Sequence, residues 1–293
     1  MKKAVNVFLY FFTVFAWGSA WVAIENQLNY VSIEVALFSR FFVASIIMLT
    51  ICGALRLKIH FSLKEHFYIF SFAVLNFSVN YFIVYKGLSY LDSSIASIIF
   101  TSMVIMNIFN YSFFFNEKMS MRSYVGSAVG FVGVVIVFGS KTISTQYSIS
   151  SFIGLGLVLL SAYVASLGNM VAIRNSRNKL PLIQVNALAM LYGTFVLSLG
   201  LVFTNAEIVF PTDNNFILST LYLSVVCTVM GFYSYYKLLE SVSPAKCSYI
   251  IALFPIVAVL LNVFLEQIAW SIFLTVGLLF SISGNIIVLS SRD

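Results

Sequence analysis

One basic residue, Arg40, stands deep inside an apolar stretch of the sequence. If that stretch crosses a membrane, a charge there is energetically expensive and is therefore a candidate for function. Arg40 lies about two helical turns, roughly 10 Å, from one end of its stretch, so its long side chain could reach the membrane surface or pair with Glu34. Pro255, in the middle of another apolar stretch, frees a carbonyl and could serve a gate. We predict gating or charge-pairing roles for Arg40, Glu25, Glu34 and Pro255, and equally a contact between Arg40 and a substrate.

Aromatic and amide side chains supply the other groups that could recognise a small molecule. Trp17 shares one helical face with Trp21 and Glu25, because these residues are spaced four positions apart. Indole rings could stack there on a planar or cationic substrate, although Trp21 also fits an aromatic belt at the membrane surface. Asn80 and Tyr81 place an amide beside a phenol near mid-membrane, whereas most single Ser and Thr residues serve as hydrogen bonds between helices. The predicted substrate-binding residues are Trp17, Asn80, Tyr81, Thr101, Tyr163, Asn169, Tyr235 and Tyr249.

The sequence offers little for catalysis or for metal binding. Its two histidines, His60 and His66, stand around one polar connection, and its three cysteines show no paired spacing. An intramembrane enzyme would need more than these residues. No Asp or Glu stands clearly within a membrane core, so a proton relay has no obvious carboxylate except Glu25 or Glu34. We predict no catalytic residue, no metal site and no cofactor, and we favour a facilitator or an exchanger.

The composition is that of a protein surrounded by lipid. Of its 293 residues, 61% are hydrophobic and only 9% are charged, against about 25% charged in an ordinary soluble domain. A soluble globule could not keep this much apolar surface out of water, and a disordered chain shows the opposite composition. The net charge of +6 is scattered between apolar runs and forms no basic patch for a nucleic acid partner.

Ten apolar segments are long enough to cross a bilayer as helices, which predicts an all-α polytopic membrane protein with ten transmembrane helices. They leave no room for a separate soluble domain. The first segment follows two lysines in the manner of a signal peptide, but it is long enough to be an uncleaved helix. The segments cover residues 4–24, 33–55, 66–85, 93–115, 123–139, 152–173, 182–203, 216–238, 245–265 and 271–290.

Lys and Arg in the connections predict the direction of the chain. With the N-terminus in the cytoplasm, 13 of the 16 basic residues fall on the cytoplasmic side, and only Lys86 and Lys141 fall on the outer side. An even number of spans then places both termini in the cytoplasm. We therefore predict a multi-pass protein of the cytoplasmic (inner) membrane of a bacterium.

The two halves of the chain resemble each other at an offset near 150 residues. Residues 22–26 read Val-Ala-Ile-Glu-Asn, and residues 171–175 read Val-Ala-Ile-Arg-Asn. Because each half holds five spans, an odd number, the two halves must lie in opposite directions in the membrane. Such inverted repeats recur in secondary carriers, which bind substrate near the midplane between the halves. We predict a first repeat at 1–140, an outer connection at 141–151 and a second repeat at 152–293.

Short motifs add a family likeness. Trp17-Gly18-Ser19-Ala20-Trp21 and Arg40-Phe41 resemble the drug/metabolite transporter superfamily, in its EamA branch, and Glu117, Pro255 and Glu266 match as well. The resemblance implies a ten-helix basket of two inverted repeats, with a central cavity lined mainly by spans 1, 3, 4, 6, 8 and 9. It also implies export or uptake of amino acids, amines or similar metabolites. Family members often carry a proline in the middle of span four, where this chain has Thr101-Ser102-Met103-Val104, so we expect that span to bend differently.

The leading hypothesis is a secondary carrier that moves small polar metabolites, most of all amino acids or related amines, by alternating access around a central cavity. The first alternative is an uptake carrier for a larger, cofactor-like metabolite such as S-adenosylmethionine, whose sulfonium would suit the aromatic residues but not Arg40. The second is a non-transporting structural or receptor-like membrane subunit, against which the internal repeat argues. The implied partners are a small-molecule metabolite and the lipid bilayer, and a homodimer is compatible with the sequence.

Overall fold

The computed structural model describes residues 2–116, 120–144, 149–204, 206–241, 244–265 and 270–290, and for some residues within its helices it describes the backbone alone. Helices that follow one another directly, or across one residue, join into ten continuous segments within these ranges. The first five are α1 (Lys2–Leu28), α2 (Ile33–Ala54), α3 (Leu63–Ala73) with η1 (Val74–Val79) and α4 (Asn80–Leu88), α5 (Ser93–Phe100) with α6 (Ser102–Phe115), and α7 (Met121–Ser144). The second five are α8 (Ile149–Arg177), α9 (Leu182–Phe203), α10 (Asn214–Leu221) with η2 (Tyr222–Met230) and α11 (Gly231–Ser241), α12 (Pro244–Phe264), and α13 (Ile272–Leu289).

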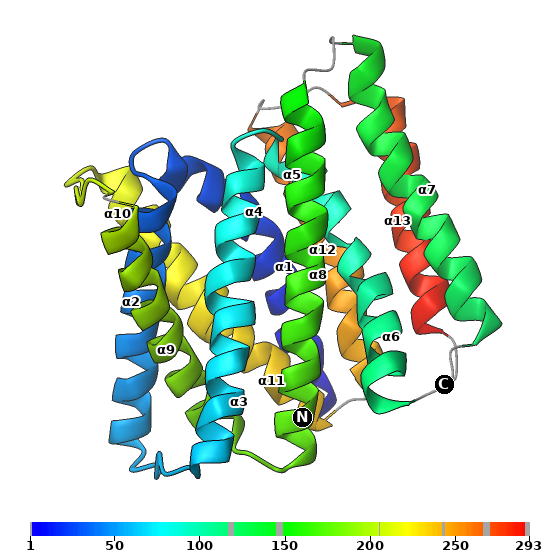
Figure 1. Ribbon diagram of the computed structural model, residues 1–293. Helices are drawn as coiled ribbons and strands as arrows, with labels where there is room; N and C mark the ends of the chain where they lie inside the picture. Colours follow the sequence, from blue (N-terminus) through cyan, green and yellow to red (C-terminus); the bar gives the residue numbers. More distant parts are fainter. Residues whose placement is uncertain are drawn as a thin grey trace.

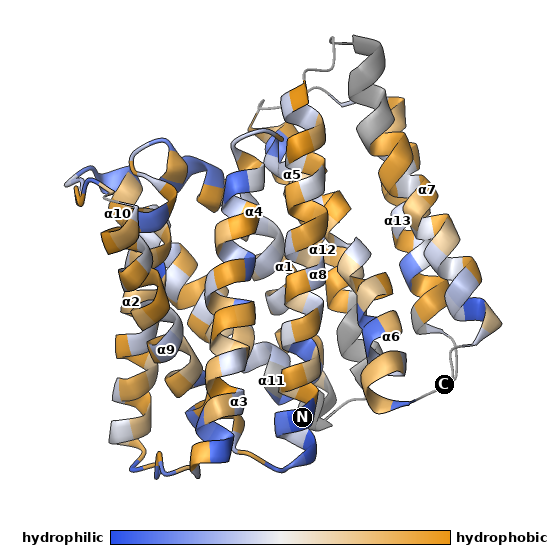
Figure 2. Ribbon diagram, viewed as in Figure 1, coloured by the Kyte–Doolittle hydropathy of each residue, from blue (hydrophilic) through white to orange (hydrophobic). Residues whose placement is uncertain are grey.

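These segments have the length and composition of membrane spans. Seven of them are long and apolar enough to cross a membrane, and shorter apolar helices lie within α7, α12 and α13. Figure 2 shows hydrophobic residues along the helices and many of the hydrophilic residues near the helix ends. The prediction of an all-α polytopic membrane protein with ten transmembrane helices is confirmed.

The two halves of the chain run in opposite directions. Both termini lie at one end of the bundle, which we call the terminal end, and α1 begins there. Its counterpart α8 begins at the opposite end (Figure 1). Each half contributes five segments, so the fold consists of two inverted five-helix repeats. The division of the chain at 141–151 stays a prediction.

Glycines bring α7 and α13 into close contact at one side of the bundle (Figure 1). A Cβ added to Gly126 would lie 2.6 Å from the carbonyl oxygen of Gly284, and one added to Gly133 would lie 2.6 Å from that of Gly277. Only glycine permits backbones to approach this closely, so the glycine pattern of α7 serves helix packing.

One π-helical segment occupies the same place in each repeat. The segments η1 and η2 correspond at an offset of about 150 residues, and so do Ser78 and Thr228 within them. A π-turn disturbs the usual backbone pairing, and each hydroxyl here donates to the carbonyl five residues earlier, at 3.4 Å from Ser78 and 2.8 Å from Thr228. Such segments are rare and often mark functional sites. Residues in or beside both of them line or contact the cavity described below.

Helices α1 and α8 continue beyond their apolar runs, where polar residues find partners elsewhere in the chain. Helix α1 continues to Leu28 and α8 continues to Arg177. Near the end of α1, Gln27 is buried and donates to the Thr220 hydroxyl at 2.8 Å. Near the end of α8, the guanidinium of Arg174 lies 3.7 Å from the centre of the Tyr68 ring. An apolar pattern cannot reveal contacts between residues so far apart in sequence.

Candidate functional site

A cavity of about 140 Å³ lies between the two repeats. Its walls come from α1, α2, η1, α4, α5 and α6 of the first repeat and from α8, α11 and α12 of the second. These are the spans that the sequence resemblance implies, with the addition of α2. Six of the residues predicted to form the site line this cavity, namely Trp17, Arg40, Asn80, Tyr81, Asn169 and Tyr235.

Arg40 carries the charge that lines the cavity. Its side chain is 2% exposed and does not reach the membrane surface. Its Nε donates to the Thr228 hydroxyl at 3.0 Å, and one terminal nitrogen donates to the Tyr85 hydroxyl at 3.1 Å. The guanidinium carbon lies 4.7 Å from the centre of the Tyr81 ring, a distance at which cation–π attraction operates. Neutral hydroxyls and an aromatic ring thus hold Arg40 in place.

Amide side chains form a second wall. Ser161 donates to the Asn80 side-chain oxygen at 2.6 Å, which fixes this amide on the cavity wall and leaves its NH₂ group available as a donor. On η1, Asn76 donates to Asn169 at 3.5 Å, and Asn169 donates to Asn107 at 3.2 Å. This chain of amides runs from the first repeat into the second and back. The wall therefore offers donors and acceptors that do not depend on charge.

Aromatic rings line the cavity beside Arg40 and the amides. The indole of Trp17 donates to the carbonyl oxygen of Cys227 at 3.2 Å and lies 5.1 Å from the Tyr235 ring. This approach requires glycine at position 231, since a Cβ there would lie 2.8 Å from the indole nitrogen. Further along α1, Trp21 stacks on Phe254 with ring centres 6.1 Å apart. A planar ligand group could lie between these two tryptophan positions.

Two predicted binding residues lie away from the cavity, and a third is outside the described side chains. Thr101 is buried, and its hydroxyl donates to the Ile98 carbonyl at 2.7 Å and shares a 2.9 Å bond with Ser281. It stands where α5 ends and α6 begins, so span four is interrupted without a proline. Tyr163 is 44% exposed on α8 and does not line the cavity. The side chain of Tyr249 is among those outside the described residues.

The predicted charge pair between Arg40 and Glu34 is not formed in the described part of the chain, because Arg40 turns to Thr228 and Tyr85 instead. Glu34 and Glu25 are partly buried and do not line the cavity, and one carboxylate oxygen of Glu25 is buried without a hydrogen-bond partner. Pro255 is buried inside α12, which continues through it. Its neighbour Phe254 is the residue that faces the cavity.

Several residues at the site escaped sequence reasoning. Asn76 precedes Asn80 by one helical turn, and this spacing was the available signal for its place on the cavity wall. Thr228, Tyr85 and Ser161 hold the lining residues from other helices. No local pattern marks them, since hydroxyl residues are common in membrane helices.

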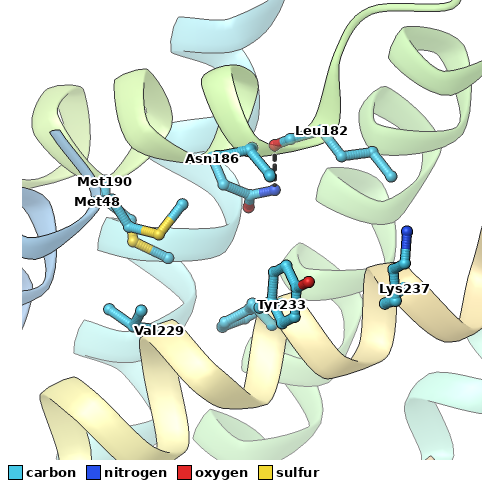
Figure 3. A pocket seen from close by; sticks show the side chains of 9 residues that line it. Met48, Leu182, Asn186, Met190, Val229, Tyr233 and Lys237 are labelled. Carbon is cyan, nitrogen blue, oxygen red and sulfur yellow. Dashed lines mark hydrogen bonds between the residues drawn. The ribbon is translucent and has the colours of Figure 1, made fainter. Parts of the chain in front are cut away.

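A second cavity, of about 80 Å³, lies between α2, α9, η2 and α11. Figure 3 shows Asn186 of α9 across from Tyr233 of α11, with its amide nitrogen donating to the Leu182 carbonyl at 2.7 Å. Phe232 lines both cavities and so stands between them. The smaller cavity has no charged residue deep inside, because Lys237 is exposed. The larger cavity is therefore the better candidate site.

Comparison with known proteins places this geometry among transporters. The sequence profile of the EamA-like transporter family matches residues 5–139 and 152–290. The chain is 25% identical over 276 residues to the "Uncharacterized transporter in trpA 3'region" of Buchnera aphidicola subsp. Schlechtendalia chinensis, covering 92% of this chain and 86% of that protein. It is 23% identical over 263 residues to Protein PagO of Salmonella typhimurium, covering 89% and 85%. A crystal structure with 14% sequence identity superposes with a TM-score of 0.74 over 97% of this chain and 96% of that one, which shows a shared fold.

Proposed function

The chain belongs to the EamA-like transporter family, and from that premise we propose that it is a secondary carrier of small polar metabolites, most of all amino acids or related amines. It would export or exchange them by alternating access around the central cavity. The observation that carries this proposal is the position of the cavity between two inverted repeats, with lining residues from both. In secondary carriers of this architecture, one repeat rocks against the other around a fixed site.

The lining groups support a polar, amino-acid-like substrate. Arg40 and the Asn80 NH₂ group offer donors to a carboxylate. The amide chain of Asn76 and Asn169 offers acceptors to an amine, and the rings of Trp17 and Tyr235 offer faces to a side chain or a cation. A small zwitterion could use all three kinds of group at once.

Both alternatives to this proposal have weaker support. A sulfonium such as that of S-adenosylmethionine would meet the like charge of Arg40 in the cavity. A structural or receptor-like subunit would have no need for a polar cavity between two repeats, and the family is one of transporters. The described residues hold no group of three or more His, Cys, Asp or Glu that could bind a metal ion.

We also propose that the terminal end of the bundle faces the cytoplasm of a bacterium. At this end, Lys58 and Lys179 lie in connections between helices, and Arg174 and Arg177 lie in the last turn of α8, as the rule of positive charge on the cytoplasmic side requires. Labelling of single cysteines introduced at the exposed positions 58 and 89 would test this. Position 89 should react with an impermeant reagent from outside the cell and position 58 should not, and the reverse pattern would contradict the orientation.

The transport proposal is tested by reconstituting the purified protein in liposomes with a pool of labelled amino acids and amines. We expect saturable uptake that preloaded unlabelled substrate accelerates, as exchange requires. Trp17→Ala should lower this flux because it removes a cavity wall, whereas Tyr163→Ala should leave it unchanged because that side chain is exposed on α8. Absence of saturable flux for every compound would contradict the proposal.

A further inference from the structure

The charge of Arg40 has no counter-charge in the described part of the protein. It donates hydrogen bonds to the hydroxyls of Thr228 and Tyr85. None of the groups that act electrostatically on it is a carboxylate. These bonds use two of the five N–H donors of a guanidinium. The hydroxyls fix the position of the side chain, but they leave its positive charge uncompensated.

The surroundings make this charge costly to keep. Arg40 is 2% exposed, and the residues packed around it are mainly apolar or aromatic, including Phe41 and Tyr85, each 0% exposed. A buried charge is normally paired with an opposite charge, because its hydration is lost on burial. Within membrane spans, unpaired ionisable residues mark ligand and ion pathways. Arg40 lines the cavity, so a ligand in that cavity can reach the guanidinium.

The fold does not require an arginine at this place. Position 190 is the counterpart of position 40 in the second repeat, and it holds Met190, which is fully buried. The same helix geometry is therefore built around an apolar side chain in the other half. A purely structural role for Arg40, joining α2 to η2 and α4, could be served by a neutral donor.

We propose that the cavity is an anion site, in which Arg40 binds the carboxylate of an organic acid or amino acid, and that amines without an acidic group are excluded. This inference rests on the proposed function and narrows its substrate class. The bound carboxylate supplies the missing counter-charge, and the Asn80 NH₂ group donates to the same end of the substrate. The rest of the substrate lies toward the rings of Trp17 and Tyr235. Cavities of about 150 Å³ hold a benzene ring, so the space of about 140 Å³ has room for one ring-sized or branched group of the substrate.

Three probes that share a phenylethyl group test the charge requirement, namely 3-phenylpropionate, phenylalanine and 2-phenylethylamine. We would measure the melting temperature of the purified protein in detergent as each probe is added. The acid and the amino acid should raise the melting temperature in a saturable way, and the amine should not, because binding to the native state stabilises it by mass action. In Arg40→Gln, which keeps a neutral donor, the concentration of acid needed for the same shift should rise at least tenfold. Lys58→Met removes a positive charge from an exposed loop after the same helix and should behave as wild type.

Two further variants keep the test decisive if Arg40→Gln does not fold. Arg40→Lys retains the charge and should retain the preference for acid over amine. Tyr85→Phe removes one hydrogen bond to Arg40 but not the charge, and should retain that preference also. Equal stabilisation by acid and amine, no stabilisation by the acid, or wild-type response of Arg40→Gln would each overturn the anion site. Liposome flux separates the two proposals, since saturable flux of a carboxylate-free amine refutes the anion site and leaves the carrier function intact.

Discussion

Replacement of Gly231 by alanine should separate substrate binding from protein stability. An added Cβ would lie 2.8 Å from the indole nitrogen of Trp17 and 3.3 Å from its Cδ1. Gly231 and Cys227 lie one turn apart on the same span, so the indole must move away from that span and lose its 3.2 Å bond to the Cys227 carbonyl. Movement in this direction carries the indole into the cavity that it lines.

The expected magnitudes follow from these contacts. Alanine gains about 1 kcal/mol over glycine in a helix, and the lost hydrogen bond costs about 1 kcal/mol. The two terms nearly cancel, so the melting temperature should change by less than about 3 °C. Substrate binding must return the indole to its crowded position, which costs about 1–3 kcal/mol. The apparent affinity should therefore fall by about 5- to 150-fold.

The assay is liposome uptake of the compound that saturates the wild-type carrier, measured over a range of concentrations beside melting curves of the same preparations. Gly156→Ala and Gly200→Ala are matched controls, because an added Cβ at either position meets nothing within 4 Å. Both should gain stability and keep the wild-type affinity. Wild-type affinity in Gly231→Ala would refute the argument that the position of Trp17 shapes the binding site.

Four further variants have expected outcomes. Asn80→Ala should lower the apparent affinity for substrate in the uptake assay about tenfold, because it removes one hydrogen bond to a charged group. Normal flux would show that this amide does not bind substrate. Ser161→Ala frees the Asn80 amide to rotate and should give a smaller loss in the same assay. Gly284→Ala should lower the melting temperature, because its Cβ would meet the backbone of Gly130. Overpacking of this kind costs about 1–3 kcal/mol. An unchanged melting curve would show that α7 and α13 can move apart freely. Tyr163→Ala should change neither flux nor stability measurably, since the exposed ring does not line the cavity.

The sequence was sufficient for the architecture because the relevant signals are long and repeated. Apolar runs mark the ten spans, and the odd number of spans in each half requires the repeats to be inverted. Which polar residues line the cavity was harder to predict than the spans, because the answer depends on which side of each helix faces the other repeat. Thr101 and Asn80 look alike in sequence as polar residues within spans, yet the first bonds to α13 and the second faces the cavity.

The contacts that hold the site together could not be predicted, because they depend on irregular helices. The π-helical segments η1 and η2 shift the side chains that follow them around the helix axis, and no sequence signal marks either segment. Thr228 of η2 reaches Arg40, which is 188 positions away in the chain. Nearness in sequence and the reach of a long side chain therefore suggested Glu34, six residues away, as a partner of Arg40.

Chemical divergence between the repeats gives the two walls of the cavity different groups. Arg40 and Tyr81 of the first repeat correspond, at an offset of 150, to Met190 and Gly231 of the second. Gly231 gives Trp17 the room to reach the Cys227 carbonyl, while Thr228 and Cys227 supply neutral oxygen atoms to Arg40 and Trp17 respectively. A second arginine at position 190 would add an unpaired charge to the membrane interior, where each such charge costs about 2.5–3.5 kcal/mol on insertion scales. The first repeat thus provides the charge and the indole rings, and the second provides space, neutral acceptors and the rings of Tyr235 and Phe254.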